Sequence, residues 1–334
     1  MNNQEIRQKL KSEEYDFLRT DKHLGDNIIF LTCGGSHSYG TNVEGSDLDI
    51  RGITIEQPNE IIGMSNFEQF MNEPTDTTIY GLRKVVKLMS NCNPNVIEIL
   101  GTKDDQIFVN TPQGQLLKDN VDLFLTKKAI SSFGGYATAQ LRRLENALAR
   151  DSYPQPEKEK HILNTIKTAM IECAEQYQEL GDGTVDLYID KSDKEDYDIE
   201  IFIDANVKHY PLRDFKNIHS IMFDTLKNYG KLTQRNSKKD EPHLLKHAMH
   251  LIRLLLTGID ILSGKGIITY REKDLKLLMD IRNGKYTYPE IFAMVDKYEK
   301  LFKEAANNCT LPNKPDFKKI EELVFEIYKG WIKW

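Results

Sequence analysis

The spacing of hydrophobic positions in the first third of the chain is typical of short strands mixed with helices. A nearly unbroken apolar run at 27–33 ends at a glycine and predicts a buried strand. Residues 47–55 alternate between polar and apolar, which predicts a second strand. On that strand Asp47, Asp49 and Arg51 would share one side, opposite the apolar residues.

Shorter elements follow the same logic. The helix predicted last in this region begins with Pro94, and proline is favoured at the first position of a helix. The succession predicts a small α/β domain over residues 1–125. The further elements that the pattern predicts here are strands at 67–72 and 76–80 and helices at 2–18, 81–91 and 94–100.

Beyond residue 125 the apolar spacing becomes helical, which predicts a helical domain over 126–334. Within it, an alternating and acidic stretch with a polar turn predicts a β-hairpin insertion near 184–203, formed by 184–190 and 197–203. The predicted helices lie at 126–150, 157–180, 212–230, 241–262 and 288–308.

Composition narrows the class of protein. The 334 residues are 40% hydrophobic and 29% charged, as in a globular protein, and a net charge of −6 gives no general argument for nucleic-acid binding. The longest apolar run, near 251–256, is too short to span a bilayer, and no cleavable leader is expected. The cysteines form no C-x-x-C pair and predict reduced thiols in a cytoplasmic protein; they are Cys33, Cys92, Cys173 and Cys309.

Candidate chemistry lies between the first two strands, in "GGSHSYGTNVEGSDLDIRG". A strand followed by Gly34, Gly35 and Ser36 leaves backbone N–H groups open to a phosphate. Asp47 and Asp49, two residues apart on one strand, would send both carboxylates to the same face, which suits Mg²⁺. Either piece alone is typical of an ordinary turn or an exposed strand edge. The Gly-Gly-Ser turn followed by the Asp-x-Asp pair, with a predicted strand on either side, favours a site for a nucleotide and a metal.

This segment resembles the signature of the DNA polymerase β-like nucleotidyltransferase superfamily, in which a hydrophobic strand, Gly-Gly/Ser, a spacer and Asp-x-Asp follow one another. Together with 76–100 and 246–255, it is similar to a family of predicted nucleotidyltransferases of bacteria and phages. The resemblance implies an α+β fold, with a polymerase β-like domain built on a small mixed sheet and a helical bundle after it.

The resemblance also implies an activity. Such enzymes move a nucleoside monophosphate from an NTP to an acceptor hydroxyl and release pyrophosphate, using Mg²⁺ or Mn²⁺. Asp47 and Asp49 would then bind the metals. A third carboxylate is expected on a neighbouring strand, where Asp76 matches best, unless it is only a turn residue; Glu73 and Glu98 are its rivals.

The nucleotide would be held by Gly34, Gly35, Ser36 and Ser46 in this resemblance. Many relatives carry an arginine shortly after the Gly-Ser pair, and this chain does not. Arg51, on the same strand face as the aspartates, is expected either to supply that positive charge or to hold one aspartate in place as an ion-pair partner.

Basic residues farther along are candidates for phosphate contact. Lys84 and Lys87 lie one turn apart on a predicted helix, whose alternative role is an ordinary solvated face. Lys246, His250 and Arg253 form a stripe on an apolar helix, where buried cations need anionic partners. We expect this stripe to line the cleft and contact the nucleotide, or else to form ion pairs with neighbouring helices. No H-E-x-x-H pattern is present, so no zinc site is expected.

Three classes of function stay open at this stage. The first is a nucleotidyltransferase whose acceptor is an RNA end, a protein or a small molecule; the basic segment 229–239 is a weak candidate for RNA contact. The second is an antibiotic nucleotidyltransferase, for which the acidic segment 180–205 would suit a polycationic acceptor. The third is a non-catalytic nucleotide sensor or interaction module, against which the intact Asp47 and Asp49 argue.

Overall fold

The fold is described from a computed structural model. Two compact units are present: Met1–Leu141 together with Leu245–Trp334 form the first, and Arg142–Leu244 the second. The residues described are 1–152, 185–191, 199–205 and 241–331, with scattered positions within 160–167 and 211–223.

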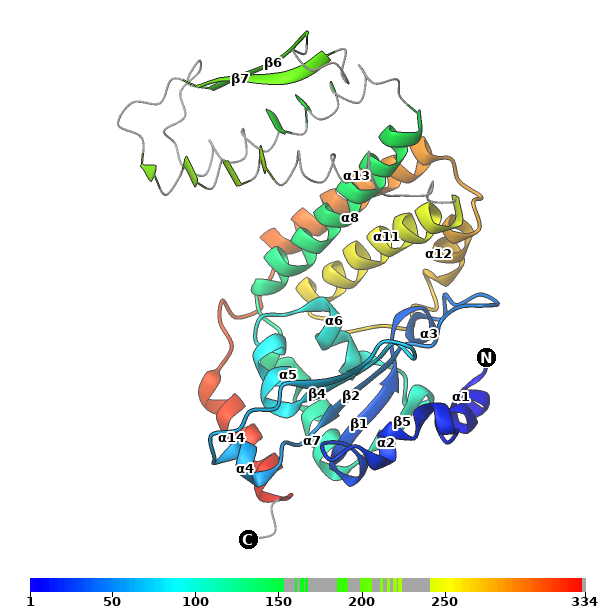
Figure 1. Ribbon diagram of the computed structural model, residues 1–334, viewed down its shortest axis with the longest axis vertical. Coiled ribbons are helices and arrows are strands. Elements are labelled where there is room, and N and C mark those ends of the chain that lie inside the picture. Colours follow the sequence, from blue (N-terminus) through cyan, green and yellow to red (C-terminus); the bar gives the residue numbers. More distant parts are fainter. Residues whose placement is uncertain are drawn as a thin grey trace. The chain divides into compact units, whose positions relative to one another are not determined.

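A five-stranded mixed sheet forms the centre of the first unit, in the order β3-β4-β2-β1-β5 (Figure 1). β2 and β4 run parallel, and the other neighbouring strands are antiparallel. Every residue of β1 is buried, because helices cover both faces of the sheet. The strands are β1 (Ile28–Cys33), β2 (Ile50–Thr54), β3 (Gln69–Asn72), β4 (Thr77–Gly81) and β5 (Ile107–Asn110).

One face of the sheet is covered by the N-terminal helices. Apolar residues such as Ile6 and Tyr15 form a cluster there with Leu31 and Ile50 of the sheet. The covering elements are α1 (Asn3–Lys9), the 3₁₀ turn Glu13–Tyr15 and α2 (Phe17–Thr20).

The opposite face is covered by helices from both ends of the chain. α14, the C-terminal helix, contributes Ile320, Leu323 and Ile327 to the same cluster as Phe30 and Ile53 of the sheet. The sheet core is therefore completed by residues about three hundred positions apart. The helices on this face are α5 (Leu82–Met89), α6 (Pro94–Ile97), α7 (Pro112–Asp119) and α14 (Phe317–Lys329).

Further helices of this unit pack beside the sheet (Figure 1), and two of them continue past its boundaries at Leu141 and Leu245. Their close approach depends on Gly258, where a Cβ would lie 2.5 Å from the Phe302 ring and 3.2 Å from Phe133. These helices are α8 (Lys128–Ser152), α11 (Glu241–Leu262), α12 (Leu275–Arg282) and α13 (Tyr288–Asn307). The remaining elements are α3 (Gly35–Tyr39), α4 (Pro58–Ile61) and 3₁₀ turns at Gly25–Asn27, Glu98–Gly101, Asp104–Gln106 and Val121–Phe124.

The predicted α+β class is confirmed: a small mixed sheet is followed by helices. The helices expected at 126–150, 241–262 and 288–308 are present as α8, α11 and α13. Most of 157–180 and 212–230, and all of 229–239, lie outside the described residues. The sequence pattern did not reveal β5, α7, α12 or α14.

Three expected elements are shorter than predicted. The N-terminal helix ends at Lys9 and gives way to a turn, and the helix at Pro94 becomes a 3₁₀ turn from Glu98. The strand expected at 47–55 was wrong at its start, because β2 begins only at Ile50. Asp47 and Asp49 therefore precede the strand instead of sharing one of its faces.

The second unit contains the hairpin that the sequence predicted. β6 (Val185–Lys191) pairs with β7 (Ile199–Ala205) in antiparallel register, and the rings of Tyr188 and Phe202 stack with centroids 5.9 Å apart. The division of the chain differs from the boundary expected near residue 125. The C-terminal helices group with the N-terminal sheet, since α14 packs in the core of that sheet.

Candidate active site

The parallel pairing of β2 and β4 brings two carboxylates together at one end of the sheet. Ile50, the first residue of β2, is paired with Thr77, the first residue of β4. The residues just before them, Asp49 and Asp76, are therefore neighbours, and the Ile50 N–H donates to the Asp76 carbonyl at 3.2 Å. Asp76 has a positive φ of 43°, which fits a turn ending directly at the strand.

Two glycines make room for this arrangement. The Gly34 N–H donates to the Asp49 carbonyl at 2.8 Å, so the Gly-Gly turn and the aspartate segment are joined. Gly35 has a φ of +51°, and a Cβ there would lie 1.8 Å from Oδ2 of Asp49. A Cβ on Gly34 would lie 2.8 Å from Cγ of Arg51. The Gly-Gly pair is thus required by the Asp49 carboxylate and the aliphatic part of the Arg51 side chain, which lie against it.

Arg51 lies between the two carboxylates. Its Nη2 is 3.0 Å from Oδ1 of Asp76 and 3.4 Å from Oδ1 of Asp49. Its Nη1 donates to the carbonyl of Ile50 at 3.0 Å and to the carbonyl of Asp76. The structure thus has the ion pair that was one of the two roles expected for Arg51.

The two carboxyl groups differ in their affinity for a proton. Burial raises the pKa of Asp49 to about 7, and the hydrogen bond that its protonated form donates to the Asp76 side chain adds to this, while Arg51 and Lys246 act in the opposite direction. The pKa of Asp76 is lowered, first by that hydrogen bond with Asp49 and then by Arg51. The two carboxyl groups thus compete for one proton, and the more buried Asp49 has the higher affinity for it.

Asp47 lies apart from this pair. It is exposed, on the loop that leads from α3 to β2. The loop is held by a residue that the sequence analysis missed: Arg282 of α12 donates to the carbonyl of Thr41 at 2.8 Å and to Oγ of Ser46 at 3.4 Å. Ser46 Oγ also accepts from the Val43 N–H at 2.9 Å. No local signal marks Arg282, because its partners lie more than two hundred residues earlier.

The predicted stripe on α11 has its two ends in different surroundings. Lys246 lies close enough to the carboxylates to lower the pKa of both Asp49 and Asp76. His250 is partly buried among cations, chiefly Arg253 and Lys246, and its pKa lies well below the ordinary value because burial and these charges disfavour its protonated form. The Lys246 end of the stripe therefore lies within electrostatic reach of the candidate site, and its contact with phosphate stays a prediction.

The Arg253 end is in the protein interior. Its guanidinium lies 3.7 Å from the centre of the Tyr39 ring, the last residue of α3, and only 8% of Arg253 is exposed. Glu98 lies beside them with its Oε1 atom buried; burial raises its pKa, while Arg253 acts in the opposite direction. Glu98 thus belongs to this interior group, and Glu73 is exposed at the start of the turn that ends at Asp76. Of the three rival carboxylates, the structure brings Asp76 to Asp49.

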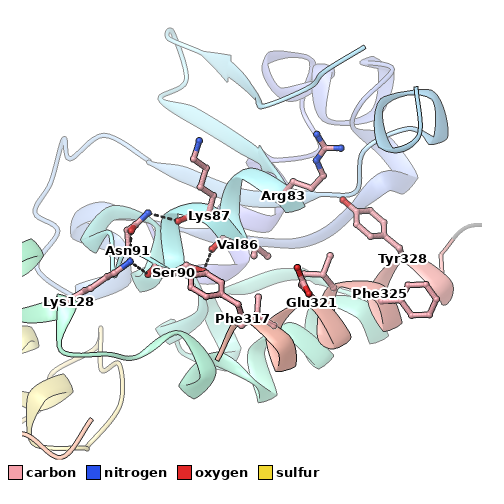
Figure 2. A pocket seen from close by; sticks show the side chains of 12 residues that line it. Arg83, Val86, Lys87, Ser90, Asn91, Lys128, Phe317, Glu321, Phe325 and Tyr328 are labelled. Atoms are coloured by element: carbon pink, nitrogen blue, oxygen red, sulfur yellow. Dashed lines mark hydrogen bonds between the residues drawn. The ribbon is translucent and has the colours of Figure 1, made fainter. Parts of the chain in front are cut away.

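Lys84 and Lys87 point to different neighbours. Lys84 forms an ion pair with Glu68 at 2.5 Å. Lys87 lines a groove of about 590 Å³ between α5 and α14, seen in Figure 2 with Arg83 and the exposed ring of Phe325. This groove contains none of the carboxylates of the candidate site, so Lys87 faces away from it.

The donor atoms at the carboxylate pair suit a hard divalent cation. Asp49 and Asp76 offer oxygen ligands only, and Mg²⁺ is usually held by one or two carboxylates together with substrate phosphates. Because position 35 has no side chain, Oδ2 of Asp49 lies directly against the backbone of the Gly-Gly turn. Within the described residues, no group of three His, Cys, Asp or Glu side chains is placed to hold a metal by itself. The residues thus fit a metal that is completed by the substrate.

A mixed sheet with this Gly-Gly turn and adjoining carboxylates defines a protein of the polymerase β-like nucleotidyltransferase superfamily. The chain belongs to the RlaP family, the RNA repair pathway DNA polymerase beta family, whose model matches residues 4–171, half of the sequence. Neither the curated proteins nor the solved structures gave a match. The predicted superfamily is therefore confirmed, and membership indicates nucleotidyltransferase activity.

The comparison leaves the individual residues as predictions. The matched range contains Asp47, Asp49 and Asp76, whereas the stripe on α11 and Arg282 lie beyond it. Among the helices in the described part of the chain, none has both the length and the hydrophobicity needed to cross a membrane.

Proposed function

We propose that this protein is a Mg²⁺- or Mn²⁺-dependent nucleotidyltransferase that moves a nucleoside monophosphate from an NTP to an acceptor hydroxyl. The observation that carries the proposal is the contact between Asp49 and Asp76 beside the Gly34–Gly35 turn. Two adjoining carboxylates offer the oxygen ligands that Mg²⁺ takes together with substrate phosphates, and family membership supplies the reaction class.

In the proposed reaction the acceptor oxygen forms a bond to the α-phosphorus while the bond to the pyrophosphate oxygen breaks. A divalent cation held by Asp49 and Asp76 would neutralise charge on the phosphates when bound. Asp76, half exposed and with a lowered pKa, holds the ionised form at neutral pH and takes the acceptor proton. Asp47, exposed on the preceding loop, supplies a further oxygen ligand. Pyrophosphate leaves.

Other residues position the nucleotide in this proposal. The triphosphate lies against Gly34, Gly35 and Ser36, where a side chain on either glycine would collide with Asp49 or Arg51. Ser46 contacts it from the loop. Lys246 approaches the phosphates from α11, since it already lies within electrostatic reach of the carboxylate pair. Arg51 completes the proposed nucleotide contacts. Lys84, His250 and Arg253, which the sequence also suggested, are left out of this set, because Lys84 is paired with Glu68, His250 is kept neutral and Arg253 covers the buried ring of Tyr39.

For the acceptor, we propose an RNA end, because the family is named for an RNA repair pathway. A protein hydroxyl or a small molecule is the alternative. The protein would act in the cytoplasm, where its buried thiols Cys33, Cys92 and Cys309 stay reduced.

The proposal is tested by incubating the protein with NTPs labelled at the α-phosphate, Mg²⁺ and an RNA oligonucleotide. Label should appear on RNA with a free 3′-hydroxyl and not on RNA whose terminal hydroxyls are blocked. Asp49→Asn is the matched control, since it keeps the shape of the side chain and removes its charge. Labelled protein in place of labelled RNA would identify a protein acceptor.

One result would contradict the proposal that this protein is an enzyme. Tight NTP binding without transfer to RNA, protein or an aminoglycoside, and without pyrophosphate release, would identify a nucleotide sensor. Transfer to the aminoglycoside alone would identify an antibiotic nucleotidyltransferase.

A further inference from the structure

Arg51 has more partners than an ordinary surface arginine. Two of its nitrogens contact two carboxylates and two backbone carbonyls, and its side chain is only 22% exposed. Its own strand is central in the sheet, with Thr32 of β1 on one side and Thr78 of β4 on the other. The backbone at Arg51 is therefore held in place by both neighbouring strands, and its side chain can move only a short distance from Asp49 and Asp76.

The carboxylate oxygens that Arg51 contacts are those proposed for the metal. A single nitrogen, Nη2, lies 3.0 Å from Oδ1 of Asp76 and 3.4 Å from Oδ1 of Asp49. A divalent cation bound to both oxygens would stand next to this guanidinium, and two positive charges at such a distance repel each other. The metal and the arginine contacts compete for the same oxygens.

We propose that Arg51 is an internal counter-ion of the Asp49–Asp76 pair, which weakens the binding of a divalent cation until the guanidinium gives up at least one of its carboxylate contacts. This inference rests on the metal site of the proposed function. Arg51 is a positioning residue here: it keeps the two carboxylates ordered and balanced in charge when no metal is bound.

A consequence is that nucleotide and metal should assist each other. A guanidinium released from a carboxylate finds a new anionic partner in a triphosphate, because arginine binds phosphate in the same forked manner as carboxylate. The NTP would then lower the cost of moving Arg51, so metal affinity should be higher with nucleotide than without it.

The test measures Mn²⁺ binding without nucleotide, by the loss of the free-ion signal in electron paramagnetic resonance. Arg51→Gln should bind Mn²⁺ at least about tenfold more tightly than the natural protein, and Arg51→Lys should lie between them. Arg83→Gln is the matched charge control, because Arg83 donates instead to the carbonyl of Glu60; it should change the affinity less than about twofold. Asp49→Asn should abolish the site in every background.

A second measurement does not depend on a variant folding. In the natural protein, the Nε–Hε resonance of Arg51 should shift on addition of Mg²⁺, and that of Arg83 should not. Equal Mn²⁺ affinities in the natural protein and Arg51→Gln, or an Arg51 resonance indifferent to Mg²⁺, would overturn the inference and leave the proposed enzyme standing. Absence of any Mn²⁺ binding that depends on Asp49 would instead overturn both.

Discussion

Helix α3 has a carboxylate and an arginine at each end, and the two groups differ in access to solvent. At its start, Asp49 and Arg51 lie against the Gly-Gly turn with side chains about one-fifth exposed. At its end, Tyr39 is fully buried beneath Arg253, which is 8% exposed. The same types of charged residue thus occur in two groups. We call Asp49, Asp76 and Arg51 the open group, and Tyr39, Glu98 and Arg253 the closed group.

The difference shows what makes charged residues available for chemistry. In the open group, Arg51 can exchange its carboxylate partners for an incoming ion or phosphate. In the closed group, no exchange can occur without disturbing the packing of α3 against α11, and breaking a buried pair is costly. We therefore expect changes in the open group to alter activity and changes in the closed group to alter stability.

The largest expected effect comes from removing the metal. A strong chelator of divalent ions should abolish transfer, and Mg²⁺ or Mn²⁺, but not Zn²⁺, should restore it, because oxygen ligands favour hard cations. The readout is labelled product formed with each added metal. Full activity in the chelator would contradict the site, whereas an unchanged melting temperature is expected because the closed group needs no metal.

Loss of one carboxylate in the open group comes next. Asp49→Ala should lower transfer by about 10³-fold or more, since it removes a ligand of the proposed metal. The free energy of unfolding at pH 8 should not fall, because burial raises the pKa of Asp49 and its ionised form is a cost to the fold. Asp47→Ala should also abolish transfer. Glu98→Gln, the control variant in the closed group, should retain most of the transfer activity. Near-normal turnover in Asp49→Ala would refute the mechanism.

The closed group gives a smaller and different effect. Arg253→Ala should lower the free energy of unfolding by about 3 kcal/mol, because it removes the guanidinium that covers Tyr39 and faces Glu98. Denaturant unfolding measures this, and NTP affinity should be unchanged in the folded variant. Lys246→Ala should instead weaken NTP binding and leave the free energy of unfolding nearly unchanged. A loss of NTP affinity in Arg253→Ala without loss of stability would return Arg253 to the nucleotide-binding set.

The smallest effect concerns pH. His250 is kept neutral by burial and by Arg253, Lys246, His247 and Arg282, so its pKa is lowered on folding. An unfolded histidine takes up a proton below about pH 6.5, and stability is therefore lost as the pH falls. Between pH 7.5 and 5.5 the natural protein should lose about 1.4 kcal/mol more unfolding free energy than His250→Asn. Parallel curves for the two proteins would show that His250 protonates freely in the fold.

The open group could be predicted from sequence more fully than the closed one. The apolar run that becomes β1, the glycines after it and the aspartates before β2 are local signals, and Asp76 follows from the family resemblance, which implies a third carboxylate on a neighbouring strand. The start of β2 was misplaced because the alternation of polar and apolar residues continues through 47–49, whereas pairing with β1 and β4 begins only at Ile50.

The closed group depends on contacts that no local pattern carries. Arg253 and Lys246 look alike on the α11 stripe, yet one meets Tyr39 and the other the carboxylate pair. Only the fold decides which end of the stripe reaches which partner. The same holds for Arg282, whose bonds to the loop span more than two hundred residues.

The place of α14 in the sheet core also affects how the chain is made. On the ribosome, the sheet and α5–α7 emerge first. Helix α14, which packs against Phe30 and Ile53 of the sheet, is synthesised last. At roughly 5–20 residues per second, the delay is on the order of ten to forty seconds. During that time an apolar surface stays uncovered on the nascent chain, so the newborn protein should depend on chaperones until Ile320, Leu323 and Ile327 have been synthesised.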